Sequence, residues 1–146
     1  MSELNFKISL IGNSKNYITL MSEYEKFPTY LPQQLKSIKI IQKTSEYTIT
    51  EENIFISSII KKNIIQQTKH FNSNDNLVTS QIISGPANGS TLSISFDDQD
   101  DKTTVSVSLN IKLGLKYKLL MPIIKKSYKI FILGILYKMQ NHIMGY

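Results

Sequence analysis

The last third of the chain constrains the fold most strongly. Between residues 105 and 113, apolar residues occupy every second position and polar residues fill the places between them. This alternation is typical of a strand with one face buried and the other in water. After Gly114 and Pro122, apolar residues recur at helical spacing and predict a long helix over about 119–140. A sheet followed by one long apolar helix needs that helix to cover its apolar face, an arrangement that often leaves a cavity between the two.

The preceding residues predict one strand, two short helices and then a series of antiparallel strands. Residues 4–11 alternate as a strand, and Ser14 is the expected N-cap of the helix that follows. Pro28 and Pro32 allow only a short second helical turn. Further strands are expected at about 35–43, 47–57, 59–71, 77–84 and 92–96, with turn clusters at 72–76, 85–89 and 97–101. This order predicts an α+β fold in a single domain, residues 1–146, with the helices on one face of a curved antiparallel sheet.

Composition excludes several kinds of site. The sequence has no cysteine, which rules out disulfides, thiolate metal sites and cysteine nucleophiles. All 17 basic residues are lysine, and lysine binds anions as a point charge without the planar fork of arginine. The net charge is +6, but the lysines are scattered along the sequence. A solvated basic surface is therefore favoured over a nucleic-acid interface.

The two ends of the chain bear on location. The first residues lack the basic start and apolar run of a signal peptide. Lys125, Lys126 and Lys129 interrupt the terminal apolar segment, and lysines in the middle of a membrane span are costly. We expect a soluble, cytoplasmic protein that is a monomer or a homodimer.

Two groups of polar residues favour plain interpretations over functional ones. The acidic run at 97–101 lacks the glycine and the distal glutamate of a calcium loop, so a solvated turn is favoured. His70 falls on a predicted strand and faces either a cavity or water, whereas His142 falls in a polar tail beyond the helix. A catalytic or metal role needs a second histidine or a carboxylate at a recognisable spacing. The sequence therefore predicts no catalytic residue, no metal site and no cofactor.

Several motifs resemble those of a known family. Residues 14–32, ending in Glu-Tyr-Glu-Lys-Phe-Pro-Thr-Tyr-Leu-Pro, are similar to its helix and proline turn. Ser-Gly-Pro at 84–86, Gly89 and Leu-Ser-Ile-Ser-Phe at 92–96 are similar to its Gly-Pro strand-turn-strand, and Thr-Thr-Val at 103–105 to the start of its last strand. The chain thus resembles the START-like superfamily of polyketide cyclase/dehydrase and lipid-transport proteins, and most closely the coenzyme Q-binding branch. It departs from that pattern at Lys102, where the family has glycine, and in having no tryptophan.

The resemblance implies both a fold and a class of function. The implied fold is a helix-grip fold, in which a sheet of six or seven strands wraps around the C-terminal helix and two short helices follow the first strand. The implied function is binding or carriage of a hydrophobic small molecule, such as a lipid, an isoprenoid quinone or a polyketide-like ring. Two alternatives stay open: a cyclase/dehydratase-like enzyme, which would place an acid–base pair in the cavity, and a membrane-associated assembly adaptor resembling an accessory protein of carbon monoxide dehydrogenase. The expected partners are a hydrophobic small molecule and, transiently, a membrane surface, but no nucleic acid.

Strand parity and helical spacing predict which side chains line the cavity. Tyr128 is expected to orient the ligand, because a tyrosine on an apolar helix face offers one polar tip. The competing interpretation is a core tyrosine bonded to the backbone. A register shift of one residue would turn every residue of a strand to its other face. The predicted lining residues are Phe96, Val107, Leu109, Ile111, Met121, Ile124, Tyr128, Ile132 and Ile135.

Overall fold

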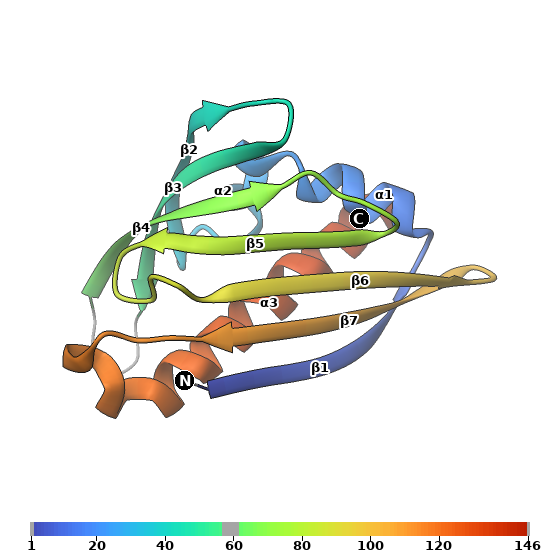
Figure 1. Cartoon of the computed structure of the whole chain (residues 1–146). Coiled ribbons are helices and arrows are strands. Elements are labelled where there is room, and N and C mark those ends of the chain that lie inside the picture. The colour runs from blue at the N-terminus through green and yellow to red at the C-terminus, as the bar shows by residue number, and fades with distance from the viewer. Residues whose placement is uncertain (1, 57–61, 146) are drawn as a thin grey trace.

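The computed structural model describes residues 2–56 and 62–145, and in this part of the chain seven strands form one antiparallel sheet (Figure 1). Their spatial order is β1-β7-β6-β5-β4-β3-β2, so β1 and β2 are the two edges. Apart from β1, each strand pairs with its neighbour in sequence, as short turns between strands require. The strands are β1 (Ser2–Ile11), β2 (Leu35–Lys43), β3 (Tyr47–Ile56), β4 (Lys62–Phe71), β5 (Leu77–Ser84), β6 (Thr91–Gln99) and β7 (Lys102–Ile111).

The helices lie on one side of this sheet. Between β1 and β2 come α1 (Ser14–Met21), the 3₁₀ turn η1 (Tyr24–Lys26) and α2 (Phe27–Tyr30). After β7 come the 3₁₀ helix η2 (Leu115–Leu120) and the long α3 (Met121–Met144), which crosses behind the sheet in Figure 1. The predicted helix-grip α+β fold is confirmed. Within the described residues, no helix combines the length and the apolar run that crossing a bilayer requires.

The core lies where β6 and β7 face α3. Val105, Val107, Leu109 and Ile111 of β7 are all buried on the face toward the helix, as the alternation predicts. From α3 they meet a buried row that includes Ile132 and Leu136. Complete burial of such a side chain stabilises the fold by about 1.5–3 kcal/mol.

The structure corrects several predicted boundaries. Asn13, not Ser14, is the N-cap of α1, and its side chain accepts a hydrogen bond from the backbone N–H of Asn16. The helix α3 begins at Met121 rather than near residue 119, because residues 115–120 form the separate 3₁₀ helix η2. It continues to Met144, so His142 lies within the helix, exposed, and not in a tail beyond it. The strand expected at 59–71 begins at Lys62, and residues 59–61 lie outside the described residues.

The acidic run is partly strand and partly turn. Asp97 and Asp98 belong to β6, and the turn that follows contains Asp100, whose φ is 58°. The Asp98 carboxylate accepts hydrogen bonds from the backbone N–H (2.7 Å) and the hydroxyl (2.6 Å) of Ser14, and these bonds lower its pKa. It therefore ties α1 to the sheet. Among the described residues, no three potential metal ligands cluster.

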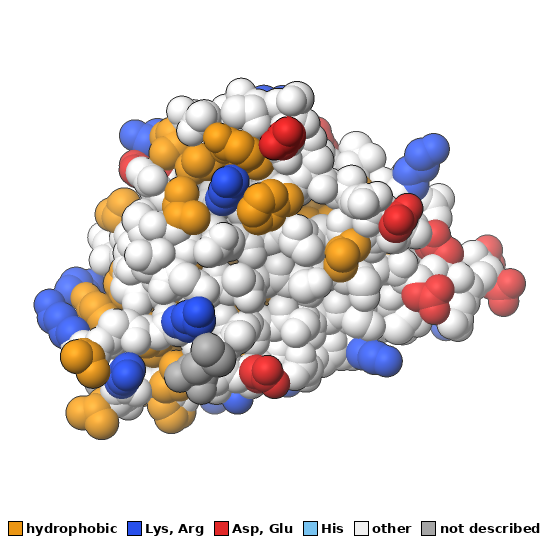
Figure 2. Space-filling view, viewed as in Figure 1, with side chains coloured by type: hydrophobic (Ala, Val, Ile, Leu, Met, Phe, Trp, Pro, Cys, Tyr) orange, Lys and Arg blue, Asp and Glu red, His pale blue; other side chains and the backbone are white. Residues whose placement is uncertain are grey.

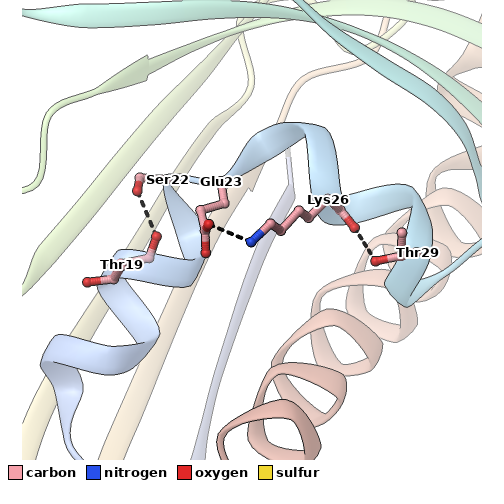
Figure 3. Close-up of polar contacts among 5 residues, drawn as sticks. All are labelled: Thr19, Ser22, Glu23, Lys26 and Thr29. Atoms are coloured by element: carbon pink, nitrogen blue, oxygen red, sulfur yellow. Dashed lines mark hydrogen bonds and ion pairs between the residues drawn. The ribbon is translucent and has the colours of Figure 1, made fainter.

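Local contacts shape the link from α1 to α2 (Figure 3). The Ser22 hydroxyl donates to the Thr19 carbonyl (2.7 Å), Lys26 pairs with Glu23 (2.7 Å), and the Thr29 hydroxyl donates to the Lys26 carbonyl (2.5 Å). These contacts satisfy polar groups at short helix ends that lack partners of their own. They hold this segment against one end of the cavity described next.

Candidate functional site

A cavity of about 130 Å³ lies between α3 and the sheet. Most of its wall is apolar and comes from strands β3 to β7, from α3 and from the α1–α2 segment. Its apolar side chains include Phe27, Ile54, Leu92, Leu109, Ile132 and Ile135. A buried space of this size and character suits about one six-membered ring.

A polar strip crosses the cavity wall on β3 and β4. Glu52 of β3 and Gln66, Thr68 and His70 of β4 line the space, and Thr50 lies buried beside them. These positions alternate along their strands, so all of them point to the concave face of the sheet. The strand register places Glu52 opposite Gln66 and Thr50 opposite Thr68, which brings the polar groups within bonding distance of one another.

The first hydrogen-bond chain runs from Ser80 to Glu52. His70 Nδ1 lies 2.9 Å from the Ser80 hydroxyl, and His70 Nε2 lies 2.8 Å from the Thr50 hydroxyl. Thr50 donates its one hydroxyl proton to Glu52 Oε1 (3.2 Å), so it accepts from Nε2–H, and Nδ1 accepts from Ser80. Burial lowers the pKa of His70 to about 4, consistent with this neutral ring. Tyr24 stacks on the imidazole, with 4.3 Å between ring centroids.

The second chain reaches the same carboxyl from the helix side. The Tyr128 hydroxyl donates to Gln66 Oε1 (3.1 Å), and Gln66 Nε2 donates to the Thr68 hydroxyl (3.5 Å). A hydrogen bond from Thr68 in turn lowers the pKa of Glu52. Both chains therefore pass their donors toward Glu52.

Glu52 is the chemical focus of the cavity. Its side chain is buried, and desolvation raises its pKa to about 7, against the opposing effect of hydrogen bonds from Thr68 and Thr50. Its second oxygen, Oε2, is buried without a hydrogen-bond partner among the described residues. No lysine is among the described residues that line this cavity. The site thus holds a carboxyl group with one oxygen satisfied and the other open to a ligand.

A second pocket of about 410 Å³ adjoins the first. Ile54, Tyr128 and Phe131 line both spaces and form the partition between them. Beyond the partition the wall is again apolar, with Ile64 and Ile123, and Lys126 contributes the charged group. Small-molecule sites usually occupy about 300–1,000 Å³. The inner cavity alone is smaller than this range, and the outer pocket falls within it.

The predicted lining residues divide into two groups. Leu109, Tyr128, Ile132 and Ile135 line the inner cavity. The others lie in or against the core and line neither pocket, because α3 lies closest to β1 and the open space remains on the side of β3 to β5. These are Phe96, Val107, Ile111 and Ile124, all buried, and Met121, which packs against the core at the start of α3.

Sequence reasoning misses the polar strip. It favours an incidental role for His70 and does not single out Glu52 or Gln66. A signal is present, because Thr48, Thr50 and Glu52 share a strand face with Ile54 and Ile56. Polar residues continuing an apolar face indicate a lined cavity or a buried network. Tyr128 bonds to the Gln66 side chain and not to the backbone.

Comparisons with known proteins identify the fold. No protein-family model matches the sequence, and no curated protein matches it. Among solved structures, a protein of Thermus thermophilus matches with a TM-score of 0.82 and 13% identity, over 99% of this chain and 98% of that one. A START superfamily protein from Mycobacterium smegmatis matches with a TM-score of 0.76 and 10% identity, over 98% and 97%. The Zhui aromatase/cyclase from Streptomyces sp. R1128 matches with 0.79 and 5%, over 97% and 95%. The chain is therefore structurally similar to START-like proteins, and at these identities the likeness shows the fold alone.

Proposed function

We propose that this protein binds and carries a hydrophobic small molecule in the cavity between α3 and the sheet. The observation that carries the proposal is a mainly apolar cavity, closed by α3, that contains one focused polar strip. Small-molecule sites typically combine such apolar walls with a few placed polar groups. The candidate ligands are a lipid, an isoprenoid quinone or a polyketide-like ring.

The size of the two pockets supports a ligand that spans them. A ring fills the inner cavity, and the rest of the molecule extends into the outer pocket past Ile54, Tyr128 and Phe131. Phe131 is only partly buried, so a change of its rotamer opens the partition at small cost. Joined in this way, the two spaces reach the usual size of a ligand site.

A cyclase/dehydratase-like enzyme is the second candidate. The observation in its favour is that Glu52 and His70, both titratable, share one cavity wall, and one protein with this fold is an aromatase/cyclase. However, both ring nitrogens of His70 are already bonded, to Ser80 and Thr50. Only Glu52 faces the space with a free atom, and one carboxyl does not make an acid–base pair. Binding is therefore the better supported function.

Transient contact with a membrane surface is proposed as the route by which the ligand is exchanged. In η2, Leu115 and Leu119 are 85% and 96% exposed, and Lys116 and Lys118 beside them are exposed as well. Apolar side chains flanked by lysines suit the interface of an anionic membrane. Figure 2 shows hydrophobic and basic side chains together at the end of the molecule where Figure 1 places η2.

Native mass spectrometry of the purified protein tests the binding function. We expect a bound hydrophobic molecule that organic extraction removes. Ile135→Phe fills part of the cavity, so it should weaken rebinding by at least about tenfold, or about 1.4 kcal/mol. Ile41→Phe, the same exchange on the exposed edge strand β2, should leave binding unchanged. A protein that carries no adduct and takes up no fluorescent lipid probe would contradict the proposal.

A further inference from the structure

One atom of the inner cavity is left without a partner. Among the described residues that line it, Glu52 Oε2 is the one buried side-chain oxygen or nitrogen that makes no hydrogen bond. Glu52 itself is 7% exposed, so bulk water does not compensate the missing bond. An unsatisfied buried acceptor is costly, and in a binding site it marks the place of a ligand donor.

We propose that the ligand carries a neutral hydroxyl group on a ring-sized end, and that this hydroxyl donates a hydrogen bond to Glu52 Oε2. The inference rests on the proposed binding function and specifies the chemistry of the same site. The ring occupies the inner cavity, and the hydroxyl points to the polar strip on β3 and β4.

The direction of the hydrogen-bond chains requires a donor on the ligand. Ser80, His70 and Thr50 donate in sequence toward Glu52 Oε1, and Tyr128 and Gln66 donate in sequence toward Thr68, next to the same carboxyl. Reversing either chain would leave a hydroxyl proton pointing at another donor. The carboxyl is therefore fixed as an acceptor on its Oε1 side, and Oε2 offers lone pairs to the cavity.

The rest of the wall favours a neutral donor over a cation. A ligand ammonium would have to lose its hydration on entering a cavity whose other walls are largely apolar, and one carboxylate compensates that cost poorly. A hydroxyl loses far less on transfer and regains its bond at Oε2. The inner volume of about 130 Å³ limits the buried end to about one ring.

Three ring-sized probes test the inference: cyclohexanol, which can donate, cyclohexanone, which can only accept, and methylcyclohexane, which can do neither. Binding is followed by the amide and methyl chemical shifts of cavity residues in NMR titrations. We expect the wild-type protein to bind cyclohexanol at least about tenfold more tightly than cyclohexanone, the value of one hydrogen bond to a charged or polarised group.

Glu52→Gln is the diagnostic variant, and Glu51→Gln is its matched control. The glutamine oxygen accepts from Thr50, which places the amide N–H₂ where Oε2 was, so the preference should reverse toward cyclohexanone. Glu51 lies one residue away on the opposite face of β3, where it bonds to Gln67 (3.2 Å) and Lys39 (3.5 Å), and its variant should keep the preference for the alcohol.

The outcomes separate the inference from the function beneath it. If wild-type protein binds all three probes equally, or the ketone more tightly, the hydroxyl assignment is overturned while the cavity remains a binding site. If no probe shifts any cavity resonance, the proposed binding function fails together with the inference. The wild-type comparison alone decides between these results, even if Glu52→Gln does not fold.

Discussion

Two side chains in the cavity wall act on stability in opposite directions. Burial raises the pKa of Glu52 from 4.5 to about 7, so the folded state holds a proton that the unfolded chain has lost, and stability falls as the pH rises from about 4.5 to 7. Burial lowers the pKa of His70 from 6.5 to about 4. The unfolded chain then takes up the proton first, and stability falls as the pH drops from about 6.5 to 4. In the range where these windows overlap, the two effects largely cancel.

Replacing Glu52 should expose the contribution of His70. Glu52→Gln removes the cost of ionising a buried carboxyl, so we expect a gain of up to about 3 kcal/mol in the free energy of unfolding above about pH 8, and little change near pH 4.5. The stability of the variant should rise steadily as the pH increases between about 4.5 and 6.5. Urea denaturation across this range measures both effects.

His70→Gln provides the opposite result. It keeps a donor for Thr50 but no longer titrates, so the stability of this variant should fall as the pH rises from about 4.5 to 7. If both variants show the same slope as the wild-type protein, the two groups are not buried in the way described.

The same residues show what sequence could not reveal at this scale. The apolar lining at Leu109, Ile132 and Ile135 could be predicted because burial follows strand and helix periodicity. The link between His70 and Glu52 could not, because their contact depends on the β3–β4 register, which brings residues far apart in sequence together. A lone histidine has no local signal that tells a cavity wall from an exposed strand.

At the scale of elements, the turn between β5 and β6 supports the cavity wall. Gly85 has φ of 100°, and a β-carbon there would lie 2.8 Å from the carbonyl oxygen of Ile65 and 3.0 Å from Gln66 Cβ. Gly85→Ala should therefore cost about 1–3 kcal/mol in unfolding free energy and disturb Gln66 in the polar strip. Gly114→Ala is the control, because nothing lies within 4 Å of its added carbon. Equal stability of the two variants in urea denaturation would contradict this role for Gly85.

Element positions were largely predictable, and their junctions were not. The bounds of β2 and β5 follow directly from the sequence pattern. The junction before α3 does not, since Leu115, Leu119 and Leu120 repeat at spacings that fit a 3₁₀ helix and an α-helix alike. Periodicity reports which side chains are buried together and carries little information on backbone hydrogen bonding. The position of the cavity depends on how α3 crosses the sheet, which no local pattern encodes.

At the scale of the whole molecule, charge is unevenly distributed along the chain. After Asp101 the sequence has eight lysines and no acidic residue, whereas four aspartates lie at 97–101. Figure 2 shows acidic side chains gathered at the end opposite the basic and apolar one. The lysines that are scattered in the sequence therefore contribute to a polarised surface, with the exposed leucines of η2 at its basic end.

This polarity predicts selective binding to anionic membranes. The protein should float with vesicles that contain phosphatidylserine and remain free of pure phosphatidylcholine vesicles, since each lysine near an anionic surface contributes about 1 kcal/mol. The double variant Leu115→Ser/Leu119→Ser should lose most of the binding without loss of stability, because both leucines are exposed. Equal flotation with both kinds of vesicle, or binding that persists in the double variant, would show that η2 is not the contact.

The location of the bound ligand tests the account most directly. Methyl NMR spectra of the protein, recorded with and without its extracted ligand, report separately on Ile132 and Ile135 in the cavity and on Leu115 and Leu119 at the surface. Binding between α3 and the sheet predicts large shifts at the two isoleucines, with contacts from ligand protons to their methyl groups. Shifts confined to the two leucines, with the isoleucines unchanged, would contradict it.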